Sequence, residues 1–330
     1  MYFKDYVVRG LRKGYRFINK KSFNPPISIS SRAEANSIIY KILDSEKGCM
    51  IARLGTTELI TINNYLCIIS PESFINKIHN YIIDNTHTPW WFEDHFHYMN
   101  VFSGIFPSNV KIAETFSKRY LNDIPLIDIL GSFQYYEKFM PFNANIVKVH
   151  LEALYPFFVQ TPWTKILTGK KVLVVHPFEE TIIQQYSKRE FLFKNKDTLP
   201  DFTLFTIKAV QSSADIKVSF EDWFGALKYM EDKIEAIDFD ICLLGCGAYG
   251  LPLAAFVKRL GKKAVHLGGG LQLLFGIKGK RWDDPLYGSH YKIPGLFEQP
   301  YNSLYNEYWT KPLAQDTPST ANLVDGAVYW

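Results

Sequence analysis

The motifs of several large enzyme classes are absent from this sequence of 330 residues. It contains no G-x-x-x-x-G-K-[ST], no G-x-S-x-G and no H-E-x-x-H, which argues against a P-loop NTPase, an α/β-hydrolase and a zincin. It also lacks an apolar run long enough to cross a membrane as a helix, and no secretory signal is visible. These absences favour a cytoplasmic protein.

Cysteine is scarce, and none of it forms a C-x-x-C pair. The four cysteines are Cys49, Cys67, Cys242 and Cys246. This usage suits a reducing compartment and argues against a zinc site. Hydrophobic residues make up 47% of the chain, which is enough for the core of one large α/β domain or two small ones.

Positive charge is concentrated at the start of the chain. Residues 1–21 hold seven basic residues and one acid, whereas the rest of the chain has 30 basic and 32 acidic residues. A body so close to neutrality argues against a nucleic-acid groove.

The basic N-terminal segment, residues 1–22, also has apolar residues at helical spacing. Phe3, Val7, Leu11, Tyr15 and Ile18 would lie on one face of a helix, with most of the basic residues elsewhere. This pattern is typical of a helix on a membrane surface, so residues 1–21 are expected to make a peripheral membrane contact. A helix docked on its own domain would show the same pattern, and both interpretations stay open.

Residues 238–282 are the stretch around which the chain is organised. An apolar run at 239–244 predicts a buried parallel strand, and a G-x-G-x-x-G turn follows it directly. Apolar residues at helical spacing from Leu253 to Leu260 predict a helix next. The N–H groups at the start of such a helix can bind a phosphate. A tight turn needed only for packing is the alternative. The turn residues assigned to ligand binding are Gly245, Gly247, Tyr249 and Gly250.

The end of the next predicted strand argues against a nicotinamide cofactor. A dinucleotide site needs an acidic residue there to hold the ribose, but the chain has His266 followed by Leu267 and three glycines. We therefore expect a different nucleotide. The ligand-binding residues expected here are His266, Gly268 and Gly269.

Predicted strands alternate with helices along the whole chain. This alternation indicates a Rossmann-like α/β fold with a mostly parallel sheet of about six strands and helices on both faces. We expect one catalytic domain over residues 23–284, with an aromatic, loop-rich tail at 285–330 packed on it. Ligands of such sheets lie beyond the carboxyl ends of the strands.

Two further groups of candidates follow predicted strands. The first is an R-x-G-x-x-E motif, in which Arg53 and Gly55 would meet a phosphate and Glu58 a hydroxyl, a metal or Arg53 itself. In the alternative, Glu58 only complements a helix dipole. The second pairs His176 with Glu179 as an acid or base, unless backbone groups merely satisfy the histidine.

A cationic loop comes soon after the last glycine turn. Lys278, Lys280 and Arg281 alternate with glycine, and such a loop can wrap a diphosphate and stabilise its developing charge. A solvated surface loop is the alternative.

These residues resemble the GT-D-type glycosyltransferases and related proteins of bacterial surface-polysaccharide gene clusters. Residues 53–58, the block at 245–282 and the aromatic segments at 306–309 and 329–330 carry the resemblance, which spans most of the chain from about residue 51 onward. It implies a Rossmann-like domain that transfers a sugar from a nucleotide-sugar donor, usually linked to UDP, to a growing glycan.

The chain departs from that family at one position. Where the family has an acid-x-acid pair tied to a divalent metal, this chain has Thr56 and only Glu58 matches. Glu58 is therefore the one expected ligand of Mn²⁺ or Mg²⁺, and hard cations need several oxygen ligands. The three cations of the 278–281 loop could neutralise the diphosphate instead.

Together these features predict a nucleotide-sugar-dependent glycosyltransferase that acts in the cytoplasm or at the inner face of the membrane. Its acceptor would be a glycan or a lipid-linked glycan, and not a nucleic acid. One alternative is another nucleotide-using transferase of surface-glycan synthesis. A non-catalytic glycan- or partner-binding protein on a degenerate transferase fold is the other.

Overall fold

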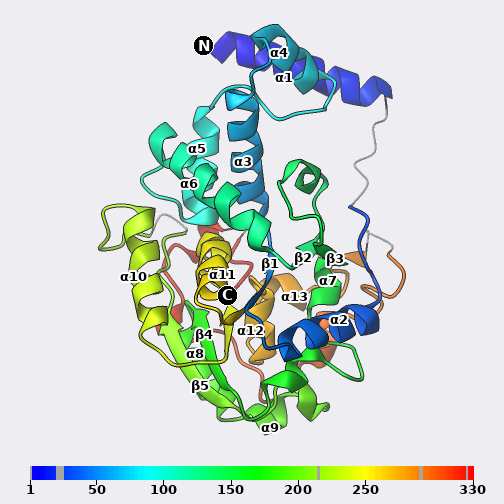
Figure 1. The fold of residues 1–330 in the computed structure, drawn as a ribbon, viewed down its shortest axis with the longest axis vertical. Coiled ribbons are helices and arrows are strands. Elements are labelled where there is room, and N and C mark those ends of the chain that lie inside the picture. The colour runs from blue at the N-terminus through cyan, green and yellow to red at the C-terminus, as the bar shows by residue number, and fades with distance from the viewer. Residues whose placement is uncertain (1, 20–25, 214–215, 290–292, 325) are drawn as a thin grey trace.

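The computed structural model describes residues 2–19, 26–213, 216–289, 293–324 and 326–330. Its centre is one sheet of seven parallel strands in the order β3-β2-β1-β7-β6-β4-β5 (Figure 1). This confirms the expected Rossmann-like α/β fold, with one strand more than the sequence predicts. The strands are β1 Cys49–Arg53, β2 Ile129–Ser132, β3 Val147–His150, β4 Lys171–His176, β5 Thr203–Lys208, β6 Ile241–Leu244 and β7 Lys263–His266.

The sheet lies between two layers of helices because its strands are apolar on both faces. In β1, Cys49 and Ile51 belong to one buried cluster, whereas Met50 and Ala52 belong to the other. Alternating side chains of a strand point to opposite faces, so each cluster is the core under one helical layer.

Helices from distant parts of the chain form each layer. One layer contains α2 Arg32–Asp44, α7 Leu151–Leu154, α8 Glu179–Tyr186 and α12 Gly270–Leu274. The other contains α3 Thr56–Ile69, α5 Glu93–Ser103, α6 Val110–Asp123, α10 Trp223–Glu235 and α11 Gly250–Arg259. Two short helices, α9 Arg189–Leu192 and α13 Lys280–Asp283, belong to the connecting segments after α8 and after α12.

Helices α1 Tyr2–Asn19 and α4 Phe74–Ile82 pack together at one end of the molecule, away from the sheet (Figure 1). The Nε atoms of Arg12 and Arg16 donate to the carboxylate of Asp84 at 2.8 and 2.7 Å. The N-terminal helix is thus docked on the rest of the chain. The boundary expected between residues 22 and 23, and the basic residues Lys20 and Lys21, lie outside the described residues.

The C-terminal tail folds back over the carboxyl edge of the sheet. The Gln272 amide donates to the Tyr329 carbonyl at 3.0 Å, and the Thr181 hydroxyl donates to the Asp316 carboxylate at 2.6 Å. The tail therefore brings its aromatic residues to the edge where ligands of parallel sheets bind. None of the helices in the described ranges has both the length and the apolar character needed to span a membrane.

Candidate functional site

A cavity of about 570 Å³ opens at the carboxyl ends of the strands. Residues at the end of a strand, or in the loop after it, reach this cavity from all seven strands. Its volume falls in the range of small-molecule and cofactor sites, and its position is the one expected for ligands of parallel sheets.

Most of the residues that the sequence singled out meet in this cavity, although they come from four different strand ends. Those that line it are Arg53, Gly55, Glu58, His176, Gly245, Gly247, Tyr249, His266, Gly268, Gly269 and Arg281.

Four of the expected site residues lie outside the cavity lining. The Lys280 ammonium donates to the Gly326 carbonyl at 3.0 Å, and the Lys278 ammonium lies 5.2 Å from the centre of the Tyr305 ring. Of the three cations expected to meet the ligand, Arg281 alone lines the cavity.

The other two residues outside the lining begin helices. Glu179 is the first residue of α8, and Gly250 is the first residue of α11. A Cβ atom on Gly250 would lie 2.1 Å from the imidazole Cε1 of His266. Gly250 therefore leaves space for the His266 ring. His266 lines the cavity, whereas Gly250 does not.

The glycine turn after β6 has the backbone that its sequence predicts. Gly247 has φ +56°, a left-handed conformation that side chains other than glycine rarely adopt, and no atom lies within 4 Å of where its Cβ would be. The turn leads through a short 3-10 segment into the N-terminus of α11. Backbone N–H groups at such a terminus can bind an anion.

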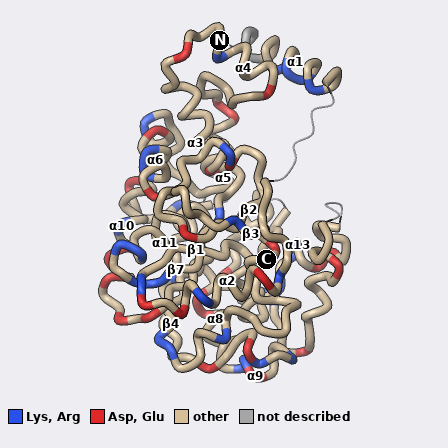
Figure 2. Tube along the Cα trace, turned by 45° about the vertical axis from the view of Figure 1, so that its right-hand side comes forward, with Lys and Arg blue, Asp and Glu red and all other residues tan. Residues whose placement is uncertain are grey.

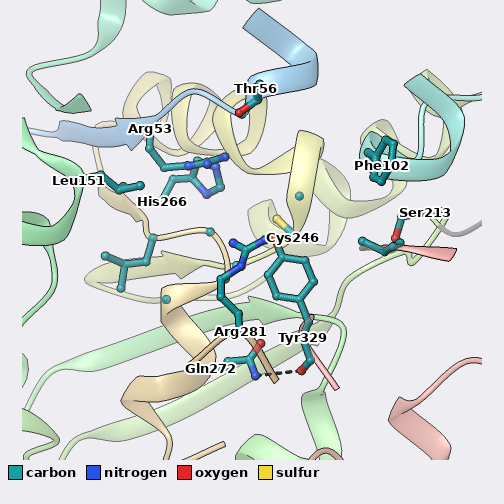
Figure 3. A pocket seen from close by; sticks show the side chains of 18 of the residues that line it. Arg53, Thr56, Phe102, Leu151, Ser213, Cys246, His266, Gln272, Arg281 and Tyr329 are labelled. Carbon is teal, nitrogen blue, oxygen red and sulfur yellow. Dashed lines mark hydrogen bonds between the residues drawn. The ribbon is translucent and has the colours of Figure 1, made fainter. Parts of the chain in front are cut away.

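Two arginines project into the cavity from opposite sides. Figure 3 shows Arg53 beside His266, with Arg281 and Tyr329 entering the same space. The guanidinium carbon of Arg53 lies 5.4 Å from the centre of the Phe133 ring, and that of Arg281 lies 4.9 Å from the centre of the Tyr329 ring. Among the described residues, no carboxylate lies within ion-pair distance of either guanidinium. The two guanidinium groups therefore share the cavity with the carboxylates of Glu58 and Glu152, but neither forms an ion pair with a described carboxylate.

Glu58 is the acidic residue nearest to Arg53 in the sequence. Its carboxylate lies against Gly55, where a Cβ would be 1.8 Å from Oε2. Burial raises the pKa of Glu58, and the neighbouring Arg53 lowers it in part. Nowhere in the described ranges do three or more His, Cys, Asp or Glu side chains gather in a way that could hold a metal ion. The surroundings of Glu58 thus do not fit the oxygen cage that Mg²⁺ or Mn²⁺ prefers.

His266 is held in one tautomer. Its Nδ1 lies 3.2 Å from the Leu244 carbonyl, which can only accept, so Nδ1 carries the proton and Nε2 keeps a lone pair. Burial, helped by the nearby charge of Arg53, lowers the pKa of His266 to about 3. The ring is therefore neutral at physiological pH and can accept a hydrogen bond through Nε2.

His176 has the opposite tautomer. Its Nδ1 accepts from the backbone N–H of Phe178 at 3.0 Å, so the proton is on Nε2. Burial lowers the pKa of His176 to about 3. The ring edge with Cδ2 faces Gly245, where a Cβ would be 2.6 Å away. A neutral His176 can thus donate from Nε2 beside the glycine turn.

A second buried carboxylate, which the sequence analysis missed, lines the cavity near the end of β3. Glu152 accepts hydrogen bonds from the hydroxyl groups of Tyr301 and Tyr287, the second at 3.4 Å. Burial raises the pKa of Glu152. His150 lines the cavity beside it. His150 ends the one strand that the sequence did not predict and Glu152 follows it, so recognising that strand was the signal that could have found them.

Comparisons of the chain with protein-family models, with curated proteins and with solved structures found no match.

Proposed function

We propose that the cavity binds a nucleotide sugar, specifically a UDP-sugar, and that the protein transfers the sugar to a glycan or a lipid-linked glycan. One observation carries the proposal: Arg53 and Arg281 meet at the carboxyl ends of a parallel sheet without a carboxylate partner among the described residues. A diphosphate supplies the negative charge that such a pair needs, and guanidinium groups match phosphate oxygens in geometry.

The neutral groups around the arginines suit the same ligand. The turn of residues 245–250 offers backbone N–H groups at the start of α11, and His176 offers a neutral N–H donor beside it. These groups bind phosphate oxygens without requiring further charge in the cavity. The resemblance of residues 53–58 and 245–282 to GT-D-type glycosyltransferases supports the same assignment.

Aromatic rings supply the surfaces for the uncharged parts of the donor. Phe133, Tyr287, Tyr329 and Trp330 line the cavity, and three of the four come from the C-terminal tail. Aromatic faces pack well against a base or a sugar ring, and a tail that closes over the donor also keeps water from the reacting carbon.

In the proposed reaction, an acceptor hydroxyl attacks the anomeric carbon of the bound sugar. A new carbon–oxygen bond forms there, and the bond between the anomeric carbon and the β-phosphate oxygen breaks. Its electron pair leaves with the nucleoside diphosphate, where Arg53 and Arg281 stabilise the developing charge. The hydroxyl proton passes to Glu58, because a raised pKa makes a carboxylate a better base. We assign no step to a metal, since the side chains around Glu58 do not fit one.

The direct test is the release of nucleoside diphosphate from a panel of nucleotide sugars, with soluble glycan acceptors. We expect release from at least one UDP-sugar, strictly dependent on Arg53 and Arg281. Binding of a nucleotide sugar without any turnover would favour the non-catalytic alternative. Turnover of another activated nucleotide donor, with no glycosyl product, would favour a different nucleotide-using transferase.

A further inference from the structure

Helix α1 is docked through basic residues, with the half-buried Val8 and Tyr15 on the same side of the helix. Arg12 and Arg16 donate to Asp84, whose side chain is fully buried, and the Arg12 guanidinium lies over the Tyr81 ring at 4.2 Å. Arg9 covers another aromatic ring at 4.5 Å. An amphipathic helix on a globular domain normally packs its apolar face inward. In α1, by contrast, part of the apolar face is turned outward.

Several apolar side chains of α1 are exposed, whereas Val8 and Tyr15 are half-buried. Val7, Leu11 and Ile18 follow one another at intervals of four and seven residues, which places them on one face of a helix. Ile18 is 78% exposed and Leu11 54%, and the neighbouring Phe17 is 85% exposed. This face has no covering element among the described residues.

Exposed apolar residues continue on the elements beside α1. Ile69 ends α3, while Phe74 and Ile75 begin α4, which packs against α1 at the same end of the molecule (Figure 1). All three are exposed, Ile75 to 79%. Exposed apolar surface of this extent marks an interaction site. The α1–α4 patch is defined as Val7, Leu11, Phe17, Ile18, Ile69, Phe74 and Ile75.

The charge at this end of the molecule favours lipid over a second copy of the chain. Residues 6–19 and 69–84 together hold five Lys or Arg residues and two Asp or Glu residues. Lys13 is exposed on α1, and Figure 2 shows basic segments along this helix. Anionic headgroups attract such a surface, whereas the same surface of a second copy would repel it.

We propose that the α1–α4 patch is a peripheral binding surface for anionic membranes. Its apolar side chains would enter the boundary between headgroups and acyl chains, and its surplus positive charge would meet the headgroups. Helix α3 links this surface to the cavity, since its first residue, Thr56, lines the cavity and its last, Ile69, belongs to the patch. At 1.5 Å per residue, its 14 residues span about 21 Å. The inference does not depend on the identity of the donor.

The test is co-sedimentation of the full chain with vesicles of phosphatidylcholine alone or mixed with phosphatidylglycerol. We expect binding to the mixed vesicles only, weakened by added salt. The double variant Leu11→Asp, Ile18→Asp should weaken binding about tenfold or more, because it removes two apolar side chains from the inserting face. Lys13→Glu should weaken binding with little risk to folding, since the side chain is exposed.

The matched control is Leu286→Asp, which puts the same charge on a residue that is 69% exposed but outside the patch. It should bind vesicles as the wild type does. The proposal would be overturned if the wild type did not bind anionic vesicles, or if all variants bound them as strongly as the wild type does. Self-association of the wild type that the double variant abolishes would overturn it in favour of a second copy on the patch.

Discussion

Two groups of arginines in this molecule differ in their partners. Arg12 and Arg16 share the carboxylate of Asp84, and Arg119 donates to Asp123 of its own helix α6 and to Glu231 of α10. Arg53 and Arg281 line the cavity and have aromatic rings beside them, but no carboxylate within ion-pair distance among the described residues.

We propose that this difference separates arginines that stabilise the fold from arginines that bind a ligand. Withdrawing a charge from water is costly unless a partner compensates it. Arg12 has the carboxylate of Asp84, whereas the buried Arg32 donates to the Glu152 backbone carbonyl. Glu58 and Glu152 line the cavity of Arg53 and Arg281 but form no ion pair with them, which is why we propose that these two arginines meet an anion from outside. The comparison predicts opposite consequences for substitutions in the two groups.

The largest expected effect concerns the paired group. Burial alone would raise the pKa of Asp84, but hydrogen bonds from Arg16 and Arg12 lower it, so the carboxylate is charged in the folded protein. Asp84→Asn should lower the free energy of unfolding of the α1–α4 end by about 3 kcal/mol, because it leaves a buried guanidinium without its partner. Hydrogen exchange of the α1 amides would measure this loss.

Two comparisons sharpen that result. Affinity for UDP should be unchanged in Asp84→Asn, since the residue is remote from the cavity lining. Asp238→Asn removes the acid of an exposed pair with Lys171 and should leave the stability unchanged. If the α1 amides of Asp84→Asn were protected from hydrogen exchange as in the wild type, the distinction between the two groups of arginines would be wrong.

The next largest effect concerns the unpaired group. Arg53→Ala and Arg281→Ala should each lower turnover of the nucleotide sugar by about two orders of magnitude, the typical cost of removing one preorganised group that stabilises transition-state charge. Lys280→Ala is the matched control: its ammonium bonds to the Gly326 carbonyl, so turnover should stay within about twofold of the wild type. Steady-state release of UDP measures all three. Equal losses in Lys280→Ala and Arg281→Ala would contradict the assignment.

A smaller effect comes from the neutral histidines beside the unpaired arginines. Burial lowers the pKa of both His176 and His266 to about 3, whereas in the unfolded chain a histidine has a pKa near 6.5. The unfolded state therefore binds more protons below pH 6.5, and stability is lost as the pH falls toward 3. At pH 5 each histidine should account for a loss of about 2 kcal/mol relative to pH 8.

Urea denaturation at the two pH values measures this loss. His176→Gln and His266→Gln should each flatten the dependence on pH, whereas His79→Gln on the surface of α4 should not. A dependence that is the same in all three variants would show that these rings are already charged, and that the arginines are not the only cations in the cavity.

The arrangement of the strands could be predicted because the pattern is local. The apolar runs at β4 and β6 and the glycine turn after β6 each indicate their structure within about ten residues. Strand β3 was missed because Val147–His150 lies at the edge of the sheet and alternates apolar with polar residues, so no apolar run marks it. Helix α5 was missed because the aromatic residues and histidines of Glu93–Ser103 show no clear helical period.

The site was predictable where its residues directly follow a strand, as Arg53 and His266 do. The sequence could not show which cation of the 278–281 loop enters the cavity. The answer depends on how the C-terminal tail folds over this loop. The Val328 carbonyl accepts from the Arg281 backbone N–H at 3.1 Å, a contact that joins segments 47 residues apart. Such long-range contacts leave no local pattern in the chain.

The most direct test of the central claim is the thermal unfolding midpoint with and without UDP. A ligand at 100 times its dissociation constant adds about 2.7 kcal/mol of stability when it binds only the folded state. UDP should raise the midpoint of the wild type and of Lys280→Ala, but not that of Arg53→Ala or Arg281→Ala, and NAD should raise none. A rise of equal size in all four proteins, or a wild type that responds to NAD and to no uridine nucleotide, would contradict the account.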